Sequence, residues 1–220
     1  MQNLEIYREY FDEAYPDYAD HQYDQIRQFI LSLPITAEAI TLLNSEEARR
    51  IYQLLIPVIK IKNYKSQIPF PIELYKAALI IVNIKNSTST ENMSETHIAL
   101  FNDLLDIQGF QLPTVSAVLH FCHPSVFPIV DRNIEAACKL LANDYADELQ
   151  LASPSLPVST TSNSNKLEKY VCFMEFLNRL SMLHNQEHET NYGLRELDKA
   201  LMVFGVERHK VDADNANNAL

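Results

Sequence analysis

The chain is poor in glycine and has no tryptophan. Its 220 residues include 3 Gly and no Trp. All-β folds and doubly wound α/β folds place glycine at many of their turns, so this scarcity argues strongly against both classes. Helical proteins need far fewer glycines, and apolar residues recur at helical spacing along most of the chain. We therefore predict an all-α fold of roughly nine or ten helices joined into one core.

Long apolar runs are also missing. The longest, KAALIIVNIKN at residues 76–86, is shorter than the roughly 20 residues that a membrane-spanning helix needs. A secretory signal would begin with a basic segment followed by an apolar run, and this pattern is not found. The sequence therefore predicts a cytoplasmic protein with no membrane partner.

Cysteine is scarce, and its spacing does not indicate a metal centre. Cys122, Cys138 and Cys172 lie far apart and form no C-x-x-C pair. Each follows apolar helical spacing, so we expect three buried, reduced thiols. His120 and His123, three residues apart at a predicted helix end, are a conceivable metal pair, but histidines there more often contact free backbone carbonyls. We predict no metal and no cofactor.

Positively charged residues are fewer than negatively charged ones. The formal net charge is −11, with 18 Lys and Arg against 29 Asp and Glu. Proteins that hold duplex DNA by charge alone need a positive face, so strong non-specific binding is not expected. The best candidates for phosphate contacts are Lys60, Lys62 and Lys65, although a solvated loop would explain them too. The first 25 residues carry seven carboxylates and one arginine, which makes this acidic N-terminal face a candidate surface for a protein partner.

Helical periodicity locates most of the predicted elements. Helices are expected near residues 23–33, 51–58, 70–85, 92–107, 112–122, 131–142, 166–184 and 192–205. Gly109 is expected to stop one of these helices, and Gly205 to end the last. Residues 152–165, rich in Ser, Thr, Asn and Pro, are predicted to form a flexible loop, and residues 211–220 a disordered tail. Residues 1–210 are predicted to form a single domain.

Residues 107–134 combine a turn, a short apolar helix, a proline-bounded loop and an aspartate at a helix start. IQGFQLPTVSAVLH is followed by FPIVDRNI, in which Asp131 is predicted to cap the next helix. This pattern resembles the helix-hairpin-helix, Gly/Pro-rich-loop, Asp superfamily of base-excision DNA glycosylases. The second segment is similar to that of adenine-specific members. A little-described bacterial branch ends its last helix in R-x-x-D-x-A-L, which GLRELDKALMVFG fits.

The resemblance implies a fold and a chemistry. The fold would be the endonuclease III-like one, with two interleaved helical lobes around a cleft and, in this divergent branch, no iron–sulfur cluster. Asp131 would be the catalytic carboxylate, and Gly109, Gln111 and Thr114 would contact DNA. Bifunctional members carry a catalytic Lys where Pro113 stands, 18 residues before Asp131. Any activity should therefore be monofunctional, with water as the nucleophile and no lyase step.

The sequence departs from the family at the second glycine of the hairpin, which is Gln111. Its Cβ costs little at a negative φ but disfavours the positive φ that glycine adopts freely. Three hypotheses stay open. The chain is a glycosylase that acts on a flipped base in DNA, or a non-catalytic module of the same fold that binds nucleic acid or a nucleotide-containing partner, or a protein-interaction module that uses its acidic N-terminal face. Capping and catalysis by Asp131 are compatible.

Overall fold

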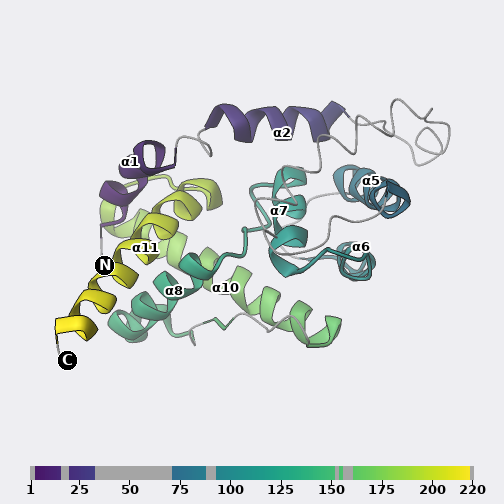
Figure 1. Ribbon diagram of the computed structural model, residues 1–220. Coiled ribbons are helices and arrows are strands. Elements are labelled where there is room, and N and C mark those ends of the chain that lie inside the picture. Colours follow the sequence, from purple (N-terminus) through teal and green to yellow (C-terminus); the bar gives the residue numbers. More distant parts are fainter. Residues whose placement is uncertain are drawn as a thin grey trace. The chain divides into compact units, whose positions relative to one another are not determined.

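The computed structural model describes residues 3–15, 20–32, 71–87, 93–151, 154–155 and 161–218. Nine helices and no strand lie within these ranges (Figure 1). The described part of the chain is therefore all-α, as the scarcity of glycine predicts. The helix expected near residues 51–58 lies outside the described residues.

The chain forms two compact units with interleaved segments. The terminal unit consists of Met1–Asp20, Val130–Pro157 and Glu168–Leu220, and the central unit of His21–Ile129 and Val158–Leu167. The chain thus starts in the terminal unit, builds most of the central unit in one stretch and then returns. Each unit is described by itself below.

The terminal unit is built around α11 (Leu194–Asn218), which packs against both α1 (Glu5–Ala14) and α8 (Arg132–Asp144). The rings of Tyr7 and Phe204 meet edge to face, with centroids 5.0 Å apart. The cationic groups of Arg195 and Lys199 lie over the Phe11 ring, 5.4 and 5.5 Å from its centroid. The short helix α9 (Ala146–Leu149) follows α8, which buries Ile134, Ala137, Cys138 and Leu141 along one side.

Helix α11 does not end where the sequence suggests. Gly205 is predicted to be its last residue, but the helix continues to Asn218 and through most of the segment 211–220 that is predicted to be disordered. A Cβ on Gly205 would overlap the backbone of Asn133 at the start of α8. Glycine is therefore needed at position 205 because two helices approach each other closely there, and the prediction of a helix end is wrong.

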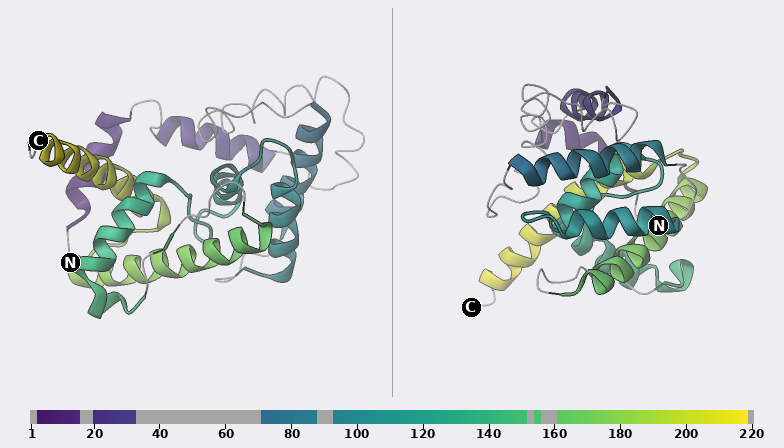
Figure 2. Two further views of the ribbon diagram at one scale, coloured as in Figure 1. Left: turned by 60° about the horizontal axis from the view of Figure 1, so that its bottom comes forward. Right: turned by 90° about the vertical axis from the view of Figure 1, so that its right-hand side faces the viewer.

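Helix α10 (Asn163–His188) is one unbroken helix of 26 residues (Figure 2). Its buried stripe includes Tyr170, Phe173, Phe176 and Leu180. Cys172 lies off this stripe and is exposed, so the prediction of a buried thiol is wrong for Cys172, while it is confirmed for Cys122 and Cys138. Because α10 begins at Asn163, the last residues of the predicted loop 152–165 are helical. Half of that loop, residues 152–153 and 156–160, lies outside the described residues.

The central unit contains α2 (Asp20–Ser32), α5 (Pro71–Asn86), α6 (Glu95–Leu105) and α7 (Leu112–Cys122). Helix α5 contacts both α6 and α7, and Figures 1 and 2 show α5 and α6 side by side. Helix α7 is buried at nearly every position from Leu112 to Cys122. Its bounds agree with those predicted from the proline near its start and from its apolar spacing.

The start of α6 is held by a capping box that uses histidine in place of the usual glutamate or glutamine. Ser94 Oγ accepts a hydrogen bond from the His97 N–H at 3.3 Å, and His97 Nδ1 accepts one from the Ser94 N–H at 3.3 Å. The other ring nitrogen, Nε2, therefore carries the proton and bonds Ser87 Oγ at 2.6 Å. His97 is fully buried, and its ring lies 5.8 Å from that of His123.

We expect the protein to lose stability as the pH falls below about 6.5, the ordinary pKa of histidine. Burial, and secondarily the nearby His123, hold the pKa of His97 below this value. Between the lowered folded pKa and the unfolded pKa, the unfolded chain binds more protons, so the free energy of unfolding decreases as the pH falls through this window. Urea unfolding from pH 7.5 to 5 measures the slope.

His97→Gln is the matched variant for this titration, because glutamine is a standard capping-box residue and does not titrate. Its slope should be smaller than that of the parent chain. The remaining slope is expected to include His184, whose pKa is also lowered, first by burial and then by His188. An unchanged slope in His97→Gln would contradict the assignment to His97.

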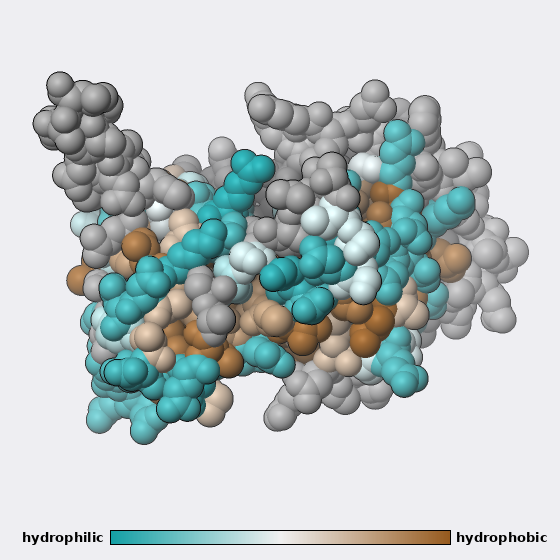
Figure 3. Space-filling view, turned by 90° about the horizontal axis from the view of Figure 1, so that it is seen from below, coloured by the Kyte–Doolittle hydropathy of each residue, from teal (hydrophilic) through white to brown (hydrophobic). Residues whose placement is uncertain are grey.

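Figure 3 shows hydrophilic side chains over much of the coloured part of one face, with hydrophobic residues reaching the surface between them. Within the described ranges, none of the helices combines the length and the hydropathy that crossing a bilayer requires.

Candidate functional site

The hairpin between α6 and α7 is a candidate DNA-contacting element and lies in the central unit. The turn after α6 is closed by bonds from the Ile107 N–H to the Leu104 carbonyl at 3.2 Å and from the Phe110 N–H to the Ile107 carbonyl at 3.0 Å. Between them, Gly109 has a φ of 89°. Residues with a Cβ rarely adopt this conformation, so glycine is needed at position 109.

Gln111 is the N-cap residue of α7, and its backbone conformation is unstrained. Its φ is −115° and its ψ is 168°, an extended conformation open to any residue. Its carbonyl accepts bonds from the Thr114 and Val115 N–H groups, both at 2.9 Å. Pro113 follows within the first turn, where a helix does not use the N–H that proline lacks. The hairpin therefore needs a positive φ at Gly109 but not at Gln111, and the missing second glycine carries no backbone penalty.

Two polar atoms at the start of α7 are buried without a hydrogen-bond partner among the described residues. They are Gln111 Oε1 and Thr114 Oγ1, and the whole Thr114 side chain is fully buried. Ser116, also fully buried, differs because its hydroxyl donates to the Pro113 carbonyl at 3.0 Å. Buried polar groups nearly always have partners, so two unpaired atoms one turn apart distinguish this turn from ordinary helix packing.

Thr114→Val is expected to leave the free energy of unfolding unchanged or to raise it by up to about 1 kcal/mol. The substitution removes a hydroxyl that is buried without a partner and puts a methyl group in its place. Ser116→Ala, which deletes a bonded hydroxyl on the same helix, should instead lower it by about 1 kcal/mol. Urea unfolding at pH 7.5 measures both. A loss of stability in Thr114→Val as large as that in Ser116→Ala would mean that the hydroxyl of Thr114 is bonded.

Asp131 is the candidate catalytic residue and belongs to the terminal unit. It is the N-cap residue of α8, in extended conformation, and its Oδ1 accepts a bond from the Asn133 N–H at 2.9 Å. Its carbonyl accepts the Glu135 N–H at 2.9 Å. The predicted helix cap is confirmed. The residue as a whole is partly exposed.

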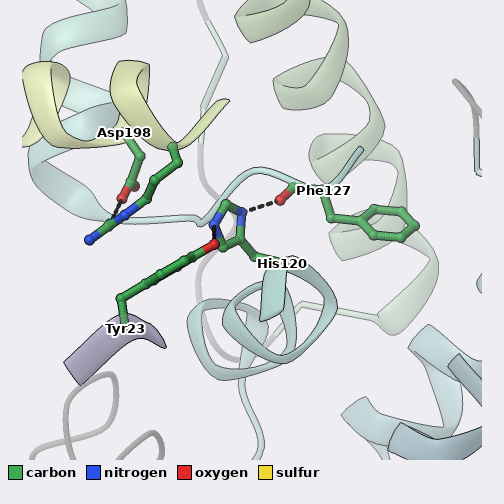
Figure 4. Close-up of polar contacts among 5 residues, drawn as sticks. Tyr23, His120, Phe127 and Asp198 are labelled. Atoms are coloured by element: carbon green, nitrogen blue, oxygen red, sulfur yellow. Dashed lines mark hydrogen bonds and ion pairs between the residues drawn. The ribbon is translucent and has the colours of Figure 1, made fainter. Parts of the chain in front are cut away.

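A hydrogen-bonded chain fixes His120 inside the central unit (Figure 4). The Phe127 carbonyl can only accept, so His120 Nδ1 carries the proton that forms the 2.7 Å bond to it. In the neutral ring Nε2 then accepts the Tyr23 hydroxyl proton at 2.9 Å. His123 likewise bonds a carbonyl, that of Ile84, at 2.7 Å. Both histidines thus contact backbone carbonyls. This is the alternative to a metal pair that the sequence indicates for His120 and His123.

No three His, Cys, Asp or Glu side chains in the described segments gather closely enough to hold a metal ion. The structure brings Gly109, Gln111 and Thr114 together in one hairpin. Lys60, Lys62 and Lys65 lie outside the described residues.

Several features of these units were not found from the sequence. The Arg195–Asp198 ion pair, 2.9 Å long and mostly buried, explains two residues of the R-x-x-D pattern (Figure 4). The partnership of Tyr23 with His120 spans 97 residues, so no local pattern could reveal it. The close approach at Gly205 was hidden because glycine after an apolar helix is also the usual signal of a helix end.

Comparison of the chain with protein-family models, with curated proteins and with solved structures finds no match.

Proposed function

We propose that the protein is a DNA glycosylase-like enzyme of the helix-hairpin-helix superfamily, and that Asp131 is the carboxylate that promotes hydrolysis of an N-glycosidic bond. The observation that carries the proposal is the order of elements along the chain. A hairpin with Gly109 at a φ of 89° leads into the buried helix α7, and a loop then leads to a partly exposed Asp131 at the start of α8. The two interleaved units agree with the lobes that this fold implies.

In the proposed reaction the bond between C1′ of the sugar and the base nitrogen breaks, and the base leaves with the electron pair and takes up a proton. The carboxylate of Asp131 stabilises the positive charge that develops on the sugar and orients a water molecule toward C1′. Water supplies the oxygen of the new bond and gives up a proton. The products are a free base and an abasic site.

The hairpin is proposed to hold the DNA backbone. Gln111 is the N-cap residue of α7, and its extended backbone is compatible with the hairpin conformation. The start of a helix favours phosphate because backbone N–H groups point outward there. With a net charge of −11, binding should be weak on intact duplex and should depend on a lesion that is easily extruded.

The test is a panel of oligonucleotides that carry single oxidised, alkylated or deaminated bases, incubated with the protein and then treated with alkali. The expected result is strand cleavage at one class of lesion after alkali and none before it, because Pro113 provides no amine for a lyase step. Asp131→Asn defines the background. If no lesion yields abasic sites above that background, the enzyme proposal is wrong.

A second candidate function is a protein-interaction module, and the outer face of α1 favours it. Glu5, Glu9 and Glu13 are exposed along this helix. Ile6 and Tyr10, one turn apart between them, are 55% and 54% exposed. An acidic surface with two apolar side chains suits a basic, amphipathic segment of another protein. Failure to bind single-stranded, duplex or lesion-bearing DNA at low salt would favour this candidate over the first.

A further inference from the structure

The residue whose N–H orients Asp131 has its backbone packed against α11. Asn133 donates its N–H to Asp131 Oδ1 at 2.9 Å, and the carbonyl group of the same residue faces Gly205. A Cβ on Gly205 would overlap the O and C atoms of Asn133 and would lie in tight contact with its Cα atom. These are backbone atoms, which cannot rotate away as the end of a flexible side chain can. A larger residue at position 205 therefore has to displace the first turn of α8 or α11 itself.

Helix α11 resists that displacement because it is anchored by buried residues in the turn before Gly205. Phe204 is almost fully buried and packs edge to face against Tyr7 of α1, with ring centroids 5.0 Å apart. Leu201, one turn earlier, is fully buried, and the helix continues after Gly205. The first turn of α8 carries the cap, so a displacement of this turn would also move the Asn133 N–H that bonds Asp131.

We infer that Gly205 is a positioning residue for Asp131. Its lack of a side chain lets α11 support the Asn133 peptide, and this contact fixes the direction of the carboxylate that the Asn133 N–H holds. The inference rests on the proposed function, in which Asp131 acts at the anomeric carbon. It assigns a role to a glycine that touches neither the carboxylate nor the base.

Gly205→Ala tests the inference. We expect the single-turnover rate of base release to fall by about 10²-fold, because a misplacement of about 1 Å at a reacting group has an effect of that size. Substrate binding should change little. In an Asp131→Asn background the same substitution should have no further effect on the rate, because the group through which it acts is already gone.

Gly193→Ala is the matched control. A Cβ on Gly193 would meet only the end of the flexible Glu196 side chain, at 3.2 Å. Its rate should equal that of the parent chain. A parental rate in Gly205→Ala would overturn the inference, and so would a loss of rate in Gly205→Ala that persists unchanged in the Asp131→Asn background.

Hydrogen exchange at the Asn133 amide separates this inference from the proposed function. In Gly205→Ala this amide should exchange faster than in the parent, whether or not any lesion is a substrate. A parent chain that releases no base overturns the function, whereas unchanged exchange at Asn133 overturns the role of Gly205.

If Gly205→Ala does not fold, hydrogen exchange in the parent chain can still test the inference. Its Asn133 amide should exchange as slowly as the core amide of Leu201. It should also exchange more slowly than the His97 amide, which donates to the side chain of the N-cap residue of α6. Exchange at Asn133 as fast as that at His97 would overturn the inference.

Discussion

Asp131→Asn is expected to reduce base release by about 10²–10³-fold while leaving the fold intact. Asparagine caps a helix about as well as aspartate, so the bond from the Asn133 N–H at 2.9 Å is kept. The negative charge is lost, so the positive charge that develops on the sugar is no longer stabilised. Removing one such electrostatic group typically lowers the rate by about 10²–10³-fold. Single-turnover assays on the responsive lesion, with thermal unfolding in parallel, measure both quantities.

Two further variants separate the roles of this residue. Asp131→Ala should lose the activity and also about 1 kcal/mol of stability, because it removes the cap together with the charge. Glu135→Gln removes a negative charge one turn further along α8, where the carboxylate pairs with Lys139 at 2.7 Å, and should leave the rate unchanged. An Asp131→Asn protein as active as the parent would restrict Asp131 to helix capping.

Phe204→Ala is expected to lower the free energy of unfolding by about 3–5 kcal/mol, the usual cost of removing a buried aromatic ring. The side chain is 1% exposed and contacts the Tyr7 ring that joins α1 to α11. Its loss leaves a cavity between two helices of the terminal unit. Urea unfolding of both proteins at pH 7.5 gives the difference directly.

Met182→Ala is the control for this loss. Met182 is 64% exposed on α10, so its truncation should change stability by no more than about 0.5 kcal/mol. Similar losses in Met182→Ala and Phe204→Ala would contradict the position of Phe204 in the core.

Local patterns predicted the parts of the structure that local forces determine. The bounds of α7 followed from its proline and apolar spacing, and the cap at Asp131 from an acidic residue before an amphipathic run. The position of α8 followed from helical periodicity. At the hairpin, Gln111 can replace the second glycine of the family only if its φ is negative. Its φ is −115°, so the replacement is compatible with the hairpin backbone.

Features that depend on distant residues were not predicted. Gly205 has the same local signature whether a helix ends there or passes another backbone closely, and only Asn133 distinguishes the two. The capping box of α6 was hidden because His97 replaces the usual acidic or amide residue. Cys172 has apolar neighbours on both sides along the chain, but it lies off the buried stripe of α10 by a fraction of a turn.

The exposure of Cys172 gives the native chain a single point of attachment for a chemical probe. Cys122 and Cys138 are enclosed, and burial raises the pKa of the Cys122 thiol to about 12 and that of the Cys138 thiol further, so neither forms the reactive thiolate near neutral pH. A maleimide dye would therefore label α10 alone, without any engineered cysteine. Its polarisation would then report on complex formation with a labelled but otherwise unaltered protein.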